Sequence, residues 1–192
     1  MEKMKTYIII VLVLALVFTI YLLMQNRREE DRRREQFLNQ FYFAATQASS
    51  HMEKIIKDRK INRDQVQDLQ DDLRRLDHTL SATELYVKNG PHYGRFYNSV
   101  AEVLEGWTHN GVKMADHFGL DGNLSAEEEQ ILKLVMNDLK QITEGMYSDA
   151  AKQEDKNMTM DRFNRLVTSV ALANLSDLAQ RIEEQNNIQP NV

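Results

Sequence analysis

The feature that most constrains this chain is a long uncharged run near its N-terminus. From Tyr7 to Met24 there is no charged residue, and the only polar side-chain atoms are the hydroxyls of Tyr7, Thr19 and Tyr21. As a helix this run is about 27 Å long, close to the hydrocarbon thickness of a bilayer. Because it is apolar on every side, it differs from the amphipathic helices of soluble bundles. The sequence therefore predicts a transmembrane helix over residues 7–24, preceded by a short tail, residues 1–6.

A cleaved signal peptide is the main alternative for this run. Signal peptides have an apolar region of about 7–15 residues that ends in a cleavage site with small residues. The residues that close the run here are not small: they are Leu22, Leu23, Met24, Gln25 and Asn26. We therefore expect the run to be retained as the anchor of a single-pass protein. A short N-terminus, one span and a helical domain form a layout common in the bacterial cell envelope, so we expect the bacterial cell membrane as its location.

The charges that flank the run give two different signals about orientation. Lys3 and Lys5 precede it, and five arginines follow it between Arg27 and Arg34. Counting Lys and Arg alone, the positive-inside rule favours a cytoplasmic position for the domain that follows. A short N-terminus with lysines is also typical of anchors that face the other way, so the cytoplasmic side is favoured but the opposite side stays open.

Residues 25–36 are rich in opposite charges at helical spacing. The expected pairs are Arg27 with Glu30, Glu29 with Arg33, Glu30 with Arg34 and Asp31 with Arg34. Each such pair stabilises an isolated helix by about 0.2–0.5 kcal/mol. We therefore expect the transmembrane helix to continue as a solvated stalk about 18 Å long. Arg27 and Arg28 stand directly after the span, so we expect them to contact lipid headgroups.

The remaining chain has the pattern of an all-α domain. It contains few residues that interrupt helices, because the whole chain has only 7 Gly and 2 Pro. Apolar residues recur at alternating steps of three and four, as in a heptad seam. Asn62 with Gln65 and Ser125 with Glu128 have the spacing of helix-capping boxes. Helices are expected over residues 37–61, 63–87, 95–118, 125–146 and 159–186.

Matched amphipathic helices with short connections pack as antiparallel neighbours. The sequence thus predicts an up-and-down bundle of four to five helices over residues 37–187, followed by a flexible C-terminus, residues 188–192. Composition excludes other classes of site. A net charge of −5 argues against nucleic-acid binding, and the absence of Cys excludes thiolate chemistry and disulfides.

No catalytic, cofactor or metal constellation is found in the sequence. The five histidines, of which His51 and His78 are two, form no Glu-x-x-His or His-Glu-x-x-His motif and are expected at surfaces or interfaces. The segment from Asp121 to Glu128 resembles half of a calcium loop, but its first ligand positions fall on His117 and Gly119, which supply no carboxylate. We interpret it as a turn followed by a capped helix, and we expect no enzyme activity.

The most unusual connection is the aromatic and arginine-bearing segment 92–97. Aromatic and Arg side chains dominate the energetics of protein interfaces. Four residues of this segment are therefore candidates for a partner surface: Tyr93, Arg95, Phe96 and Tyr97. The alternative is that Phe96 and Tyr97 simply begin the core of the third helix.

These observations indicate a non-catalytic interaction or scaffold module that is anchored in a membrane. Its expected partners are the lipid bilayer and either another protein or a second copy of itself. The alternative is a sensor that binds a small ligand between its helices. A second span would normally follow such a sensor domain, and the sequence has none, so a small-molecule ligand is disfavoured but left open.

Overall fold

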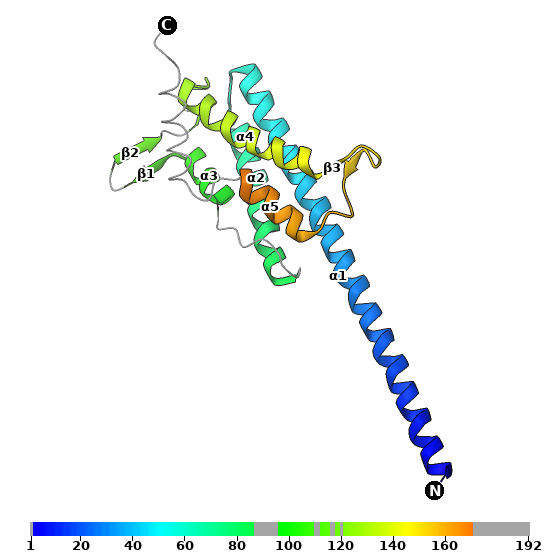
Figure 1. Ribbon diagram of the computed structural model, residues 1–192. Helices are drawn as coiled ribbons and strands as arrows, with labels where there is room; N and C mark the ends of the chain where they lie inside the picture. Colours follow the sequence, from blue (N-terminus) through cyan, green and yellow to red (C-terminus); the bar gives the residue numbers. More distant parts are fainter. Residues whose placement is uncertain (1, 87–95, 110–111, 116–117, 120, 171–192) are drawn as a thin grey trace.

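The computed structural model describes residues 2–86, 96–109, 112–115, 118–119 and 121–170. Its largest element is α1, Glu2–Asp58, a single helix that extends far beyond the other elements (Figure 1). The stretch contains no Gly and no Pro, so nothing in it interrupts the backbone hydrogen bonds. The apolar run, the charged segment and the first bundle helix therefore form the one uninterrupted helix that the sequence predicts.

The N-terminal part of α1 is the only candidate membrane span within the described residues. Its most apolar stretch is long enough to cross a bilayer, and 0% of that stretch is buried inside the protein. The first buried side chains of the helix are Phe37 and Leu38, at 4% and 0% exposure. Below them every described side chain is exposed except that of Arg34, which is partly covered, and above them the helix is the centre of the bundle (Figure 1).

The second helix, α2 (Arg63–Tyr86), returns along α1. Asn62 and Gln65 cap its start reciprocally: the Gln65 N–H donates to Asn62 Oδ1 at 2.8 Å, and the Asn62 N–H donates to Gln65 Oε1 at 3.0 Å. This is the capping box predicted from the sequence. In both helices the apolar residues that recur at steps of three and four are buried, as the heptad pattern predicts. Their exposures are 8% or less: Leu38, Phe41, Ala45, Ala48, Met52 and Ile55 on α1, and Val66, Leu69, Leu73, Leu76 and Leu80 on α2.

The third helix is much shorter than predicted. α3 runs only from Phe96 to Leu104, and two strands follow it, β1 (Trp107–His109) and β2 (Val112–Ala115), which pair antiparallel. The prediction of one helix over 95–118 was therefore wrong. Gly106 has a φ of 93°, a left-handed value that ends the helical path.

The fourth helix, α4 (Ala126–Met146), begins at the predicted capping box. Ser125 Oγ accepts the Glu128 N–H at 3.2 Å, and Glu128 Oε2 accepts the Ser125 N–H at 2.7 Å. A short hairpin of β3 (Tyr147–Ser148) and β4 (Gln153–Glu154) then leads to α5, Met160–Val170. The predicted continuation of this last helix to residue 186 lies outside the described residues.

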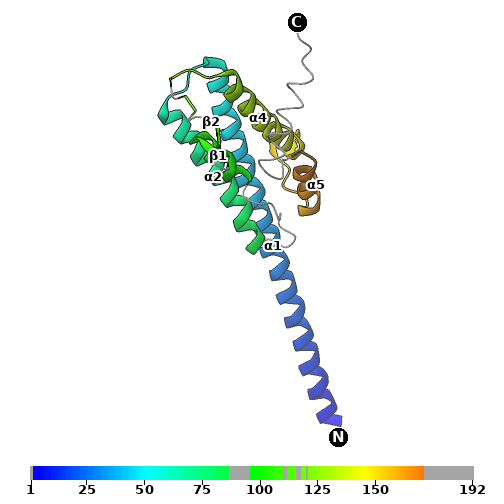
Figure 2. The same ribbon diagram turned by 90° about the vertical axis from the view of Figure 1, so that its left-hand side faces the viewer.

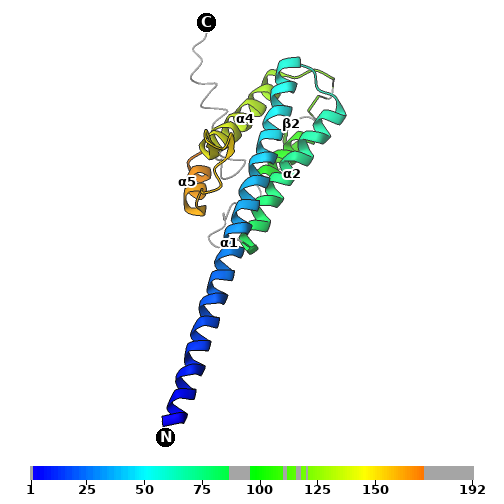
Figure 3. The ribbon, with the colours of Figure 1, turned by 90° about the vertical axis from the view of Figure 1, so that its right-hand side faces the viewer.

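The bundle is assembled around α1. Two views from opposite sides place α1 between α2 and α4 (Figure 2, Figure 3), and α4 crosses α1 obliquely (Figure 1). α3 packs on α2, and α5 packs on α4. The α5 side chain Phe163 also reaches α1, where its ring lies 5.0 Å from Phe37 and 5.1 Å from Phe41, edge to face in both pairs. The result is the predicted helical bundle led by a long apolar helix.

The far end of the bundle is closed by backbone hydrogen bonds between two turns. The Ile61 N–H donates to the Gly122 carbonyl at 3.3 Å, and the Leu124 N–H donates to the Arg59 carbonyl at 3.2 Å. Gly119 lies against Ile61 with a φ of +67°, and a Cβ at this position would stand 2.3 Å from Ile61 Cγ2. The connection before α4 is thereby fixed to the corner between α1 and α2.

Candidate functional site

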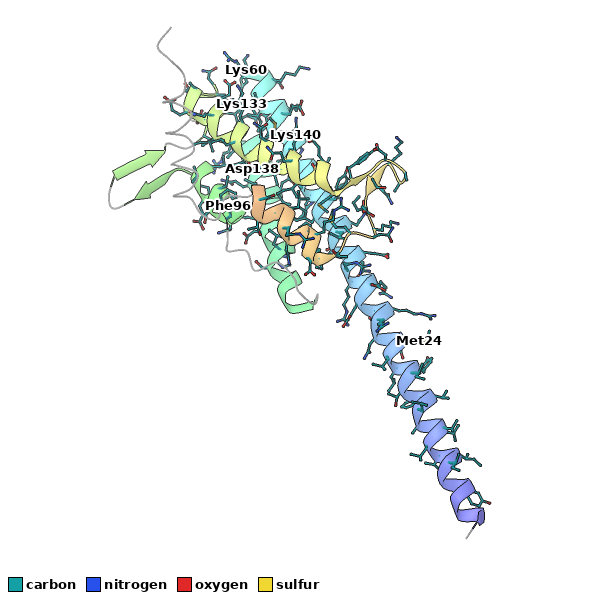
Figure 4. The ribbon with its side chains drawn as sticks, viewed as in Figure 1. Met24, Lys60, Phe96, Lys133, Asp138 and Lys140 are labelled. Atoms are coloured by element: carbon teal, nitrogen blue, oxygen red, sulfur yellow. The ribbon has the colours of Figure 1, made fainter. Side chains whose placement is uncertain are left out.

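The charged segment of α1, residues 25–36, lies in solvent. All its side chains are exposed except that of Arg34, which is partly covered. Two ion pairs run along it, Arg33 with Glu29 at 3.8 Å and Arg34 with Asp31 at 2.7 Å. Within the described residues, Arg27 and Arg28 take part in no ion pair, so their guanidinium groups are available at the end of the apolar run. Figure 4 places Met24, the last residue of that run, well away from the bundle.

The aromatic segment before α3 is only partly described. Tyr93 and Arg95 lie outside the described residues. Phe96 and Tyr97 are buried, at 6% and 2% exposure, and their rings meet edge to face at 5.2 Å. This is the arrangement expected if the two side chains begin the core of α3, and it leaves neither ring on a surface open to a partner.

A His–Asp pair joins α1 to α2 near the far end of the bundle. His51 Nδ1 lies 2.7 Å from Asp72 Oδ2, and the side chains are 37% and 4% exposed respectively. Burial raises the pKa of the Asp72 carboxyl, and the facing His51 opposes that rise. On the α3-facing side of α2, Arg74 instead pairs with Glu105 at 2.6 Å.

Beside this pair is a small hollow of about 70 Å³, lined by His51, Lys54, Ile55, Gln65 and Asp68. In hydrolases the Asp of a His–Asp pair orients the imidazole, and the imidazole then takes a proton from a neighbouring nucleophile. The five residues that line this hollow include no Ser, Thr or Cys. No group of three or more His, Cys, Asp or Glu side chains able to hold a metal ion occurs in the part of the chain that the structure describes.

The pair was not predicted, although the sequence carries a signal for it. Asp72 is three residues after Leu69 and four before Leu76, so it lies on the same face of α2 as the buried seam. A carboxylate at such a position needs a partner from the facing helix, because burial disfavours its charge. Periodicity alone does not identify which residue of α1 supplies that partner.

A second buried carboxylate lies where the β3–β4 hairpin meets α1. Glu154 is 2% exposed, and Asn39 Nδ2 donates to its Oε1 at 3.1 Å. Burial raises the pKa of the nearby Tyr42 hydroxyl, and negative charge on Tyr147 and Glu154 adds to the rise. The sequence predicted only a connection here, between the helices expected over residues 125–146 and 159–186, so this contact was also missed.

Next to this junction, the outer face of α1 is unusual for a solvent-exposed helix. From Gln36 to Ser50 the sequence contains no charged residue. The exposed side chains of this stretch are Gln36, Asn39, Gln40, Phe43, Thr46 and Ser50. Phe43 is 63% exposed, and Tyr147, at 39%, is the only other large apolar side chain in the described bundle that is similarly exposed. We call this surface the uncharged face of α1.

The uncharged face lies opposite the core. The buried residues of α1 follow one stripe, Leu38, Phe41, Ala45, Ala48, Met52 and Ile55. The outward residues of the uncharged stretch follow another, Gln36, Gln40, Phe43, Gln47 and Ser50, of which only Gln47 is partly buried. Both stripes advance by alternating steps of three and four, the spacing at which side chains meet a neighbouring helix. α1 therefore presents two seams, and only one of them is covered by the part of the bundle that the structure describes.

Comparison of the chain with protein-family models, with curated proteins and with solved structures finds no match.

Proposed function

We propose that this chain is a single-pass membrane protein whose helical bundle acts as a non-catalytic interaction module at the bacterial cell membrane. The observation that carries the proposal is the unbroken course of α1, Glu2–Asp58, from an apolar run into the bundle core. A hinged tether would require a break between these two parts. A continuous helix instead transmits position and rotation from one part to the other.

The exposure of the apolar run supports a membrane environment. Every large apolar side chain described between Tyr7 and Met24 is at least 42% exposed. Burying one such side chain is worth about 1.5–3 kcal/mol, so a run of this length is unstable in water. Its apolar residues cover all sides of the helix, which matches lipid better than a single protein partner.

The charged segment gives the bundle a fixed height. Residues 25–36 span about 18 Å as a helix. Arg27 and Arg28, at the lower end of this segment, are placed to bind anionic headgroups, with about 1 kcal/mol for each charge near the surface. We propose that they fix the depth of the anchor, and that the bundle meets its protein partners above them. The five arginines after the run, against two lysines before it, favour the cytoplasmic side for the bundle.

The small-ligand alternative receives less support. Pockets for drug-sized ligands enclose about 300–1,000 Å³. The hollow beside His51 and Asp72 measures about 70 Å³, which suits a few waters or a small ion. No described observation favours a sensor over an interaction module.

The test uses the absence of Cys in the chain. A single-Cys variant, Gln141→Cys on the exposed side of α4, is expressed at full length. We expect it in the membrane pellet after alkaline carbonate washing, and released by detergent. A maleimide that cannot cross the membrane then reports the side: no labelling of intact cells but labelling of broken cells is expected for a cytoplasmic bundle. Recovery in the carbonate supernatant would refute the membrane anchor.

A further inference from the structure

We propose that the uncharged face of α1 binds the same face of a second copy of this chain, so that the protein forms a parallel dimer within the membrane. The inference rests on the proposed function, because it requires both copies to share one bilayer. It goes beyond that function by naming the partner and the surface. Its centre is Phe43, the midpoint of the stretch from Gln36 to Ser50.

The lack of charge on this face is the first argument. Charged residues make up 28% of the chain, yet the stretch from Gln36 to Ser50 has none. A solvated helix face normally carries Lys, Glu or Arg, whereas the centre of an interface is depleted of charge and enriched in aromatic residues. Phe43 is 63% exposed at this centre, so its ring is available to a partner.

Symmetry identifies the partner. Two copies anchored in one membrane stand parallel, and because α1 is continuous, equal residues lie at equal heights. A two-fold axis along the membrane normal then brings each residue of this face near its own counterpart. Like charges at these positions would repel, and none is present between Gln36 and Ser50. Glutamine amides both donate and accept hydrogen bonds, so Gln40 can pair with Gln40 of the second copy.

The surroundings of the face leave room for this contact. α2 and α4 lie on the two flanks of α1 (Figure 2, Figure 3), and most side chains of the uncharged face are exposed. Below the face, Glu29 and Arg33 continue the same stripe, and they already pair within one copy at 3.8 Å.

The stripe also indicates how strong the contact is. Amide and hydroxyl side chains at seam positions specify register but bind more weakly than Leu or Ile. Confinement of two copies to one membrane raises their effective concentration, so a weak contact suffices there. We therefore expect dimers in the bilayer at native orientation, with Phe43 contributing most of the apolar contact.

Disulfide crosslinking in native membranes tests the proposal. Three single-Cys variants of the full-length chain are compared: Gln40→Cys and Ser50→Cys on the uncharged face, and Gln141→Cys as a matched exposed position on α4. Under mild oxidation the first two are expected to form an adduct of twice the 22.4 kDa chain mass. Random collision of copies in one membrane would crosslink all three positions equally. A specific contact at the uncharged face should therefore raise the yield of the first two variants about tenfold above that of Gln141→Cys.

A second substitution tests the role of Phe43. In the Gln40→Cys background, Phe43→Glu places two like charges at the centre of the contact and should abolish most of the adduct. Gln141→Glu, which adds the same charge elsewhere, should leave the adduct unchanged. Phe43 is mostly exposed, so both variants are expected to retain their far-UV helical signal.

The outcomes separate this inference from the proposed function. A chain that is absent from the membrane pellet refutes the proposed function and the dimer with it. If the chain is retained in the membrane, three results would overturn the dimer alone. These are equal adduct yields at all three positions, an intact adduct in the Phe43→Glu variant, and an adduct that contains a different protein.

Discussion

The two halves of α1 share one backbone and obey different rules. Below Gln36 the described side chains are exposed apart from that of Arg34, and helix formation rests on propensity, on ion pairs and on the surrounding medium. From Phe37 upward one side of the same helix is buried against α2, α4 and α5. One continuous helix can therefore be stabilised by the surrounding medium in its lower half and by packing against the bundle in its upper half. Substitutions in the two halves should have different effects.

The largest contrast is expected from removing a phenylalanine in each half. Phe41→Ala deletes a ring that is 0% exposed and lies 5.1 Å from the ring of Phe163. We expect the free energy of unfolding of the bundle to fall by about 3–5 kcal/mol, because a buried cavity is left. Phe18→Ala removes a ring that is 61% exposed in the lower half, and it should leave the bundle unchanged. Urea unfolding of the full-length chain in detergent micelles measures both.

Equal losses in the two variants would mean that the apolar run folds with the bundle as one unit. That outcome would contradict the division of α1 at Phe37.

A charge in the middle of the apolar run should have the converse effect. Leu14→Arg costs about 2.5–3.5 kcal/mol of insertion free energy at the centre of a span. We expect a large drop in the carbonate-resistant membrane fraction, whereas the detergent-solubilised bundle keeps its Tm. Gln141→Arg, which adds the same charge to the bundle surface, should change neither quantity. Retention of Leu14→Arg in the membrane at the original level would show that this run is not what anchors the chain.

The upper half of α1 also depends on the turn that holds its end. Gly119→Ala introduces a Cβ against Ile61 and forces a left-handed backbone on alanine, so a loss of about 2–4 kcal/mol is expected. Gly122 has a φ of +80°, but no atom lies within 4 Å of the position that a Cβ would take, so Gly122→Ala should cost only about 1–2 kcal/mol. Thermal unfolding compares them, and a smaller loss for Gly119→Ala would mean that the Ile61 contact yields without strain.

The features that sequence predicted well are local. The seams of α1, α2 and α4 follow from helical periodicity, and both capping boxes follow from residues three apart that bond to each other's backbone. The continuity of α1 follows from the absence of Gly and Pro and from charge pairs one turn apart. None of these features depends on distant parts of the chain.

The sequence predicted poorly the regions whose structure depends on contacts with distant residues or on two competing local patterns. Trp107 and Met114 lay within the helix predicted over residues 95–118, but β-branched and aromatic residues around Asn110-Gly111 are also a strong hairpin signal, and strands form on both sides of this dipeptide. For Phe96 and Tyr97 the sequence left two possibilities open, a partner surface or the core of the third helix, because burial depends on packing against distant residues. Likewise, Phe43 resembled any other apolar residue of α1 until the packing showed that its side of the helix faces outward.

The smallest predicted effect concerns the charge that α2 brings against the upper half of α1. Burial raises the pKa of the Asp72 carboxyl, Asp68 adds to the rise, and His51 and Arg75 oppose it. A carboxyl with a raised pKa in the folded state stabilises the fold below its unfolded pKa of about 3.9, and this contribution is lost as the pH rises through the folded pKa. Asp72→Asn cannot ionise, so its Tm relative to the original chain should be higher at neutral pH than at about pH 4.

His51→Gln sharpens this prediction, because it removes the imidazole that opposes the rise. In that variant the loss of stability between acid and neutral pH should grow, and a second substitution of Asp72→Asn should cancel the growth. If instead Asp72→Asn lowers Tm more at neutral pH than in acid, attraction to His51 outweighs burial. Charge attraction would then stabilise the contact between α1 and α2, as ion pairs stabilise the exposed residues 25–36. The two halves of α1 would then differ only in the packing of their apolar side chains.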